Sequence, residues 1–271
     1  MNRALRLLAV FPHPDDESMG LGSTLAYYAT KADVETHLVC ATRGERGWSG
    51  PAEENPGLTA LGRIREAELR CAAQVLGLHS LTFLDYIDGD VDQANPAQII
   101  ADIVAQVRHI RPHVVVTFGP DGAYGHPDHI ALAQFTAGAL ACAANPAYAD
   151  PGNGSPFQVQ KFYYMVDSKE TSQALLALMG PFGMEIDGVQ RQMVGWEEWA
   201  VTTRIDARTL IATVREAIAC HHSQLAGLDA LMAQPDAVLA TFFGVGTFVR
   251  VFSLVNGGRA TETDLFEGLS T

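Results

Sequence analysis

Continuous apolar runs alternate with amphipathic segments along the first half of the chain. Apolar runs bounded by turn residues predict buried strands, and four of them are present: Arg6–Phe11, Glu35–Cys40, Leu81–Leu84 and His113–Phe118. Apolar residues at helical spacing predict helices between and after these runs, at Ser18–Thr30, Leu58–Leu76, Pro96–Ile110 and Pro127–Ala144. Strands that alternate with helices of this length predict an α/β fold with a Rossmann-like, mostly parallel, doubly wound sheet flanked by helices.

After residue 150, apolar runs and amphipathic segments no longer alternate regularly. The pattern there predicts strands at Phe162–Val166, Trp199–Ile205 and Thr247–Leu254, and helices at Thr171–Leu178 and Ala207–His221. No shift in composition separates the two halves. We therefore expect a single domain over residues 1–271, with the core in residues 1–149 and its C-terminal part in residues 150–271.

Composition and charge narrow the class of protein. The net charge of −13 argues against a nucleic-acid surface, and no apolar run approaches the ~20 residues that a membrane span needs. The apolar stretch at the N-terminus is too short for a signal sequence. The cysteines are scattered, at Cys40, Cys71, Cys142 and Cys220. We expect a cytoplasmic enzyme with four reduced thiols, and the sequence leaves open whether it forms a homo-oligomer.

Two acidic histidine clusters follow predicted strands. His13-Pro-Asp-Asp-Glu17 follows the first strand, and His126-Pro-Asp-His129 follows the strand that ends at Phe118. Ligands of open α/β sheets bind outside the carboxyl ends of strands, so both clusters are predicted at the same edge. An Asp in such a turn is often a helix N-cap, but a cap does not explain a histidine and three acids within five residues. The composition favours a divalent metal site.

The first cluster is a tight turn. Pro14 disfavours helical backbone at His13, and His13 and Asp16 are three residues apart, so both can converge on one ion. Asp15 would point elsewhere but would stay close to a water bound to that ion. We therefore expect metal ligation by this turn.

The second cluster begins a helix at Pro127, a favoured first helical residue. His126 and His129 are three apart and share one face of that helix. One of them can bind the metal while the other serves the chemistry, with Asp128 fixing its tautomer through a hydrogen bond. The residues alone do not decide which histidine has which role.

These motifs together resemble the LmbE-like (PIG-L) family of zinc-dependent N-acetylglucosaminyl deacetylases. The resemblance covers roughly the first half of the chain and depends mainly on the two histidine clusters. Further matching segments are Thr42-Arg-Gly-Glu45, Arg63-x-x-Glu66, Tyr124-Gly-His126 and, in the second half, His221-His-Ser-Gln224.

The resemblance implies a metal centre and a base. His13, Asp16 and His129 would be the zinc ligands, and Asp15 would be the general base. This ligand set would also hold iron(II), cobalt or manganese.

The resemblance also implies roles for residues around the metal. His126, held by Asp128, would stabilise the oxyanion or protonate the leaving amine, and Tyr124 would lie close to the reacting carbonyl. Glu45 and Arg63 would bind the sugar.

The function implied is removal of the N-acetyl group from an N-acetylglucosamine-type sugar or conjugate, by metal-activated water and an Asp base. One rival is a zinc-dependent amidase that cleaves a larger thiol–sugar conjugate with the same chemistry. A second is a dinucleotide-binding oxidoreductase, because Gly20-x-Gly22 matches part of the dinucleotide fingerprint. A third is a metal-binding or sugar-binding protein without catalysis.

Overall fold

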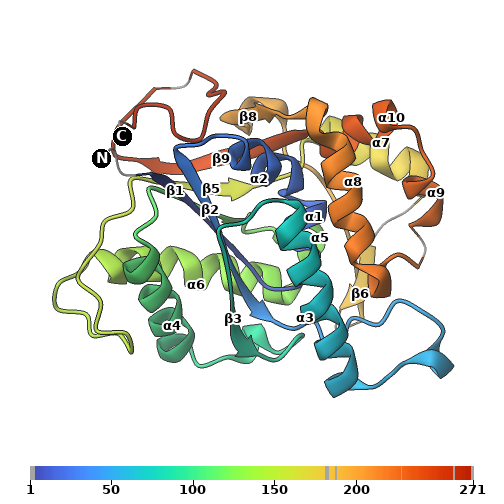
Figure 1. The fold of residues 1–271 in the computed structure, drawn as a ribbon, viewed down its shortest axis with the longest axis horizontal. Helices are drawn as coiled ribbons and strands as arrows, with labels where there is room; N and C mark the ends of the chain where they lie inside the picture. The colour runs from blue at the N-terminus through green and yellow to red at the C-terminus, as the bar shows by residue number, and fades with distance from the viewer. Residues whose placement is uncertain (1–3, 181–182, 187, 227, 259, 270–271) are drawn as a thin grey trace.

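A seven-stranded sheet, within the residues that the structure describes, forms the centre of the molecule (Figure 1). The computed structural model describes residues 4–180, 183–186, 188–226, 228–258 and 260–269. In spatial order the strands are β3 (Ser80–Tyr86), β2 (Val34–Thr42), β1 (Leu5–Phe11), β4 (Val114–Phe118), β5 (Lys161–Met165), β9 (Val245–Ser253) and β8 (Thr203–Asp206). The strands from β3 to β5 are parallel, and β9 is antiparallel to both β5 and β8.

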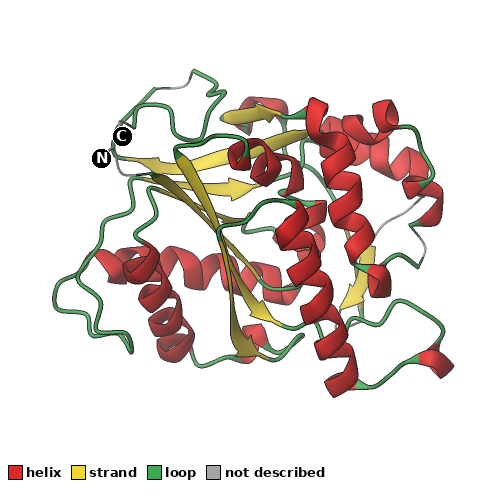
Figure 2. Cartoon of the chain, in the orientation of Figure 1, coloured by secondary structure: helices red, strands yellow, loops and turns green. Residues whose placement is uncertain are grey.

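Helices cover both faces of this sheet (Figure 2). The longer helices are α2 (Gly22–Ala29), α3 (Leu58–Val75), α4 (Pro96–Ile110), α6 (Pro127–Ala144), α7 (Lys169–Met179), α8 (Ile211–Cys220) and α10 (Asp236–Phe243). Single turns form α1 (Asp16–Met19), α5 (Gly122–Gly125) and α9 (Asp229–Met232). Among the described residues, no helix is both long and apolar enough to cross a membrane.

The two faces of β1 show why this strand is apolar at every position from Leu7 to Phe11. Leu7 and Phe11 pack in the core cluster under α2, α3 and α8. Leu8 and Val10 pack in the cluster under α4 and α6. A parallel strand with helices on both sides has no solvent face, so its sequence is a continuous apolar run. Each such leucine contributes roughly 1.5–3 kcal/mol through its burial. The predicted α/β fold with a mostly parallel, doubly wound sheet is confirmed.

Several local predictions differ from the structure. The helix predicted at Ser18–Thr30 is two helices, α1 and α2, which are separated near Gly20. The strand predicted at Trp199–Ile205 forms only from Thr203 onward, because Trp199 is exposed in a 3-10 turn. The hairpin of β6 (Gly183–Ile186) and β7 (Val189–Gln192) and the helices α9 and α10 were not predicted.

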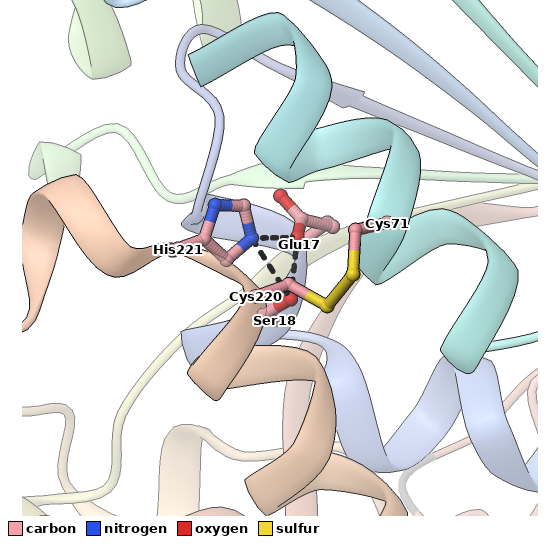
Figure 3. Close-up of a disulfide and its surroundings, with 5 residues drawn as sticks. All are labelled: Glu17, Ser18, Cys71, Cys220 and His221. Carbon is pink, nitrogen blue, oxygen red and sulfur yellow. Dashed lines mark hydrogen bonds and ion pairs between the residues drawn. A yellow bond between two sulfur atoms is a disulfide. The ribbon is translucent and has the colours of Figure 1, made fainter. Parts of the chain in front are cut away.

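The prediction of four reduced thiols is wrong. Cys71 on α3 and Cys220 at the end of α8 form a disulfide, although 149 positions separate them in the sequence (Figure 3). Cys40 and Cys142 are free. No Cys-x-x-Cys or other local spacing marks this pair, because packing of α3 against α8 brings the two cysteines together.

Candidate active site

The predicted site residues other than Arg63, together with Asp88, lie at or shortly after the carboxyl ends of four adjacent parallel strands. His13 follows β1, Glu45 follows β2 and Asp88 follows β3. The cluster from His126 to His129 follows β4 and begins α6. The sheet order β3-β2-β1-β4 places these four strand ends side by side, so residues more than a hundred positions apart meet at one edge.

His13, Asp16 and His129 converge with their potential ligand atoms close together. Nδ1 of His13 lies 3.3 Å from Nε2 of His129 and 3.6 Å from Oδ2 of Asp16. Oδ1 of Asp16 is 3.6 Å from Nε2 of His129. Two imidazoles and one carboxylate match the three protein ligands of a catalytic zinc site. His13, His126 and Asp128 form a second group whose ligand atoms lie within 4.8 Å of one another.

Carboxylates hold the other ring nitrogen of His13. Nε2 lies 3.0 Å from Oδ2 of Asp128 and 3.1 Å from Oδ1 of Asp88. Asp128 in turn accepts hydrogen bonds from the backbone N–H groups of Gly89 and Val91. A proton on Nε2 leaves Nδ1 of His13 with a free lone pair, which is the usual arrangement of a histidine that binds a metal. This contact favours a metal site formed by His13, Asp16 and His129, in which Nδ1 of His13 would be the ligand atom.

The charges around these residues favour a cation. Burial, and then the nearby charge of Asp15, raises the pKa of Asp16 to about 8 against the opposing effect of His13. Burial alone would lower the pKa of His13, but its hydrogen bonds with Asp128 and Asp88 raise it to about 10. The shift of His13 shows that the neighbouring carboxylates stabilise a positive charge at this position. The donor set therefore fits a divalent ion, which would bind these groups in their deprotonated forms.

Asp15 has a strained backbone beside this group. Its φ of 110° and ψ of −30° are rare for a residue other than glycine. Its N–H donates to Oε2 of Glu17, and its own carboxylate accepts from Arg65 at 3.2 Å. Burial raises the pKa of Asp15, although Arg65 opposes the rise. A carboxylate with a raised pKa, next to a potential metal site, suits a general base.

His126 does not pair with the carboxylate of Asp128, contrary to the expectation. Its Nδ1 accepts instead from the backbone N–H of Asp128 at 3.2 Å, as the N-cap of α6. Burial, and then the neighbouring His13, lowers the pKa of His126 to about 4. The ring is therefore neutral near pH 7 and carries its proton on Nε2. The Tyr124 ring lies close by, 5.9 Å from the His126 ring and 5.5 Å from the His129 ring.

Of the two residues expected to bind a sugar, one lies near the site. Glu45 has a buried carboxylate oxygen, Oε2, without a hydrogen-bond partner among the described residues. Arg63 is exposed on α3, and its contact with a sugar stays a prediction. The arginine of α3 that reaches the site is Arg65, which is buried and donates to the carbonyl oxygens of Pro14 and Gly44.

The residue that follows α8, His221, contacts the first histidine cluster and the residue after it (Figure 3). Nε2 of His221 lies 2.8 Å from Oε1 of Glu17 and 3.3 Å from Oγ of Ser18. The side chains of Glu17 and His221 are fully buried. Burial raises the pKa of Glu17, but His221 outweighs it and lowers the pKa. This contact fixes the turn that contains Asp15 and Asp16.

The segment after α8 also binds α3 and the loop after β2. Ser223 donates from its backbone N–H and its hydroxyl to the carboxylate of Glu68, at 2.8 and 2.7 Å. Gln224 donates to the carbonyl oxygen of Gly47. Sequence reasoning found this segment but gave it no role. The arginine and the glutamate of α3 that are buried are Arg65 and Glu68. They have the same three-residue spacing as the predicted Arg63-x-x-Glu66, but they lie two positions later in the chain.

A cavity of about 420 Å³ opens beside these groups. Asp15, Asp16, Tyr124 and His129 line it on the side of the sheet edge. Two of the three potential metal ligands, Asp16 and His129, therefore face a space that can hold a small molecule.

Comparison with known proteins identifies the family. The model of the PIG-L family, GlcNAc-PI de-N-acetylase, matches residues 8–140. A 1D-myo-inositol 2-acetamido-2-deoxy-alpha-D-glucopyranoside deacetylase from Rhodococcus erythropolis is 35% identical, over 98% of this chain and 98% of its own. This chain belongs to the PIG-L family. The deacetylase of the same name from Kineococcus radiotolerans is 33% identical, over 100% of this chain and 84% of its own. The predicted family and the prediction of an amide-hydrolysing deacetylase are confirmed.

Solved structures share the fold at lower identity. The N,N'-diacetylchitobiose deacetylase from Pyrococcus horikoshii matches with a TM-score of 0.68 and 20% identity, over 92% of this chain and 84% of its own. The 4-carboxy-2-hydroxymuconate hydratase from Pseudomonas putida KT2440 matches with a TM-score of 0.64 and 19% identity, over 94% of this chain and 100% of its own. The fold thus occurs with two different reactions, so likeness of fold alone does not define a reaction.

Proposed function

We propose that the chain is a zinc-dependent N-deacetylase that hydrolyses the acetamide of an N-acetylglucosamine-type sugar or conjugate. The observation that carries this proposal is the convergence of His13, Asp16 and His129 on the side of a cavity, with Asp15 beside them. The names of the related deacetylases support the substrate class. Iron(II) and other divalent transition metals suit the same ligands.

His13, Asp16 and His129 would hold the ion. A divalent ion bound there would supply Lewis-acid chemistry, which acidifies water and polarises a carbonyl. Asp15 accepts a proton as water adds to the acetamide carbon, and it returns that proton to the nitrogen as the C–N bond breaks. Acetate and the free amine are the products. Arg65 keeps the Asp15 carboxylate in place for both transfers.

The groups around the carbonyl stabilise the charge that develops on its oxygen. His126 donates from Nε2, because Nδ1 is occupied by the backbone of Asp128. The Asp128 carboxylate contacts Nε2 of His13 and orients that ring. Tyr124 lies next to the reacting carbonyl, and Glu45 contacts sugar hydroxyls.

Amine release tests the proposal directly. Zinc-loaded protein should release free amine from N-acetylglucosamine or its methyl glycoside, and a chelator should stop the release. Asp15→Asn should keep the metal, as measured by elemental analysis, and should lose on the order of a hundredfold or more in turnover because its base is missing. Normal turnover in Asp15→Asn would show that another group takes the proton. A lack of amine release from every acetylated sugar, with full metal content, would refute the deacetylation.

A further inference from the structure

The cavity beside the metal-binding residues has two chemically different sides. Asp121 follows β4 and Asp167 follows β5, so these polar lining residues lie at the same sheet edge as Asp15 and His129. The opposite side is formed by α7, α9 and α10, which gather beyond α8 at the right of Figure 1. Whatever occupies the cavity therefore contacts polar groups near the reacting atoms and a helical wall away from them.

The helical wall is apolar. Its lining residues from the three helices, apart from Thr171, are Leu175, Met179, Leu231, Met232, Phe242 and Phe243. Thr171 lies in the first turn of α7, and its hydroxyl is within 3.1 Å of the Ser168 hydroxyl, which is a partner inside the protein. The wall thus offers an incoming ligand almost no hydrogen bonds.

Methionine is concentrated around this cavity. The chain has seven methionines, and five of them line the cavity: Met19, Met165, Met179, Met193 and Met232. Methionine side chains are unbranched and adaptable, and they are common at surfaces that bind varied apolar ligands. Their concentration next to the potential metal ligands is typical of a binding surface.

We propose that this helical wall binds an apolar chain on the substrate. The inference rests on the proposed deacetylation, and it specifies the substrate class as an amino sugar that carries an alkyl-like group. The sugar would stay at the polar sheet edge, and the chain would lie along α7, α9 and α10. A hydroxyl-rich group such as a second sugar would lose its hydrogen bonds to water at this wall without replacing them.

The apolar chain can be attached in two places, and both give the same contact. It can be the aglycone of an N-acetylglucosaminide, or it can be a long acyl group on the nitrogen. Two series of compounds separate these sources: methyl, butyl and hexyl N-acetylglucosaminides, and N-acetyl, N-butanoyl and N-hexanoyl glucosamine.

Binding by metal-free protein tests the wall without depending on turnover. Calorimetric titration should show affinity rising roughly threefold to fourfold for each added methylene in at least one series, because each buried methylene adds a nearly constant increment. A rise in the first series assigns the wall to the aglycone, and a rise in the second assigns it to the acyl group. Equal affinity along both series would overturn the proposal.

Substitutions on α7 locate the contact. Leu175→Gln and Met179→Gln place an amide in the wall at positions that are only partly buried. Each should reduce the ratio of hexyl to methyl affinity about threefold or more. The matched control is Leu178→Gln on the same helix, because Leu178 is exposed and does not line the cavity. A ratio that is unchanged in Leu175→Gln and Met179→Gln would overturn the proposal, since the chain would then bind elsewhere.

Amine release from the same compounds separates the two proposals. In zinc-loaded protein, kcat/KM should rise along the series that shows the rise in affinity, mainly through a lower KM. If affinity rises with chain length but no compound releases amine, the deacetylation is refuted while the apolar site is supported. If amine is released equally well along both series and affinity is also flat, the deacetylation is supported and the apolar site is refuted.

Discussion

Breaking the Cys71–Cys220 disulfide should lower the stability of the folded chain by a measurable amount. The bridge closes a loop with a sequence separation of 149 residues. For a loop of that length, the entropy lost by the unfolded chain corresponds to about 5 kcal/mol at 25 °C, whereas bridges usually contribute 2–4 kcal/mol. We expect the double variant Cys71→Ser/Cys220→Ser to lose about 2–4 kcal/mol in the free energy of unfolding.

Thermal melting followed by circular dichroism measures this loss. For a chain of this size, each kcal/mol corresponds to roughly 2–4 °C in Tm, so the double variant should melt about 5–15 °C below the wild type. Dithiothreitol should lower the Tm of the wild type by a similar amount, because it reduces the bridge to two thiols and is itself oxidised to a cyclic disulfide. The double variant should not respond to the reductant.

Two controls connect the effect to this bridge. Cys142→Ser removes a free cysteine and should leave the Tm and its response to dithiothreitol unchanged. Thiol titration of the denatured chain should find two free thiols before reduction and four afterwards. Four thiols before reduction, or a double variant that melts within about 1 °C of the wild type, would refute the reasoning.

Three further predictions concern buried ionisable residues. Lys161→Met should lower the free energy of unfolding by about 3 kcal/mol, measured in urea, because Glu262 loses a fully buried partner at 2.7 Å; a loss under 1 kcal/mol would contradict this. Burial, and then the charge of Asp121, raises the pKa of Asp167 to about 6, so the folded state binds the extra proton and wild-type stability falls as pH rises from about 4 through 6. Asp167→Asn should accordingly be about 1–2 kcal/mol more stable than the wild type at pH 7.5 and equal to it at pH 4, and a gap that does not depend on pH would argue against this titration. His129→Ala should lower zinc content sharply in elemental analysis, and full occupancy would remove His129 from the ligand set.

Local sequence patterns predicted the parallel half of the molecule, for a physical reason. Buried parallel strands require continuous apolar runs, and the strand-end position of His13 and His126 follows from chain order alone. The contact between His221 and Glu17 spans 204 positions, and neither residue has a local period that could indicate the other. The hairpin β6–β7 was not predicted, although Met184 and Ile186 alternate with polar residues ahead of Asp187-Gly188, a pair that favours tight hairpin turns.

Arg63 and Arg65 show the limit of motif matching within a helix. In an α-helix, residues that are two positions apart differ by about 200° around the helix axis. A shift of two positions therefore moves a side chain to nearly the opposite face. The motif matched the exposed Arg63, whereas Arg65 is the buried arginine that contacts Asp15. Burial separates the two arginines, and it depends on how α3 packs.

The C-terminal half has a part in the chemistry although it supplies none of the proposed metal ligands. Asp15 is held in a backbone conformation that costs about 1–3 kcal/mol, and α1 has no side-chain cap of its own. Two contacts offset this cost. Glu17 accepts a hydrogen bond from the N–H of Asp15 and is itself fixed by His221 of the C-terminal half, and Arg65 of α3 donates to the Asp15 carboxylate. Charge-assisted hydrogen bonds of this kind contribute roughly 1.5–3 kcal/mol each, which is enough to hold the strained turn. The parallel strands therefore place the reacting groups, and the segment after α8 keeps the proposed base in its working conformation.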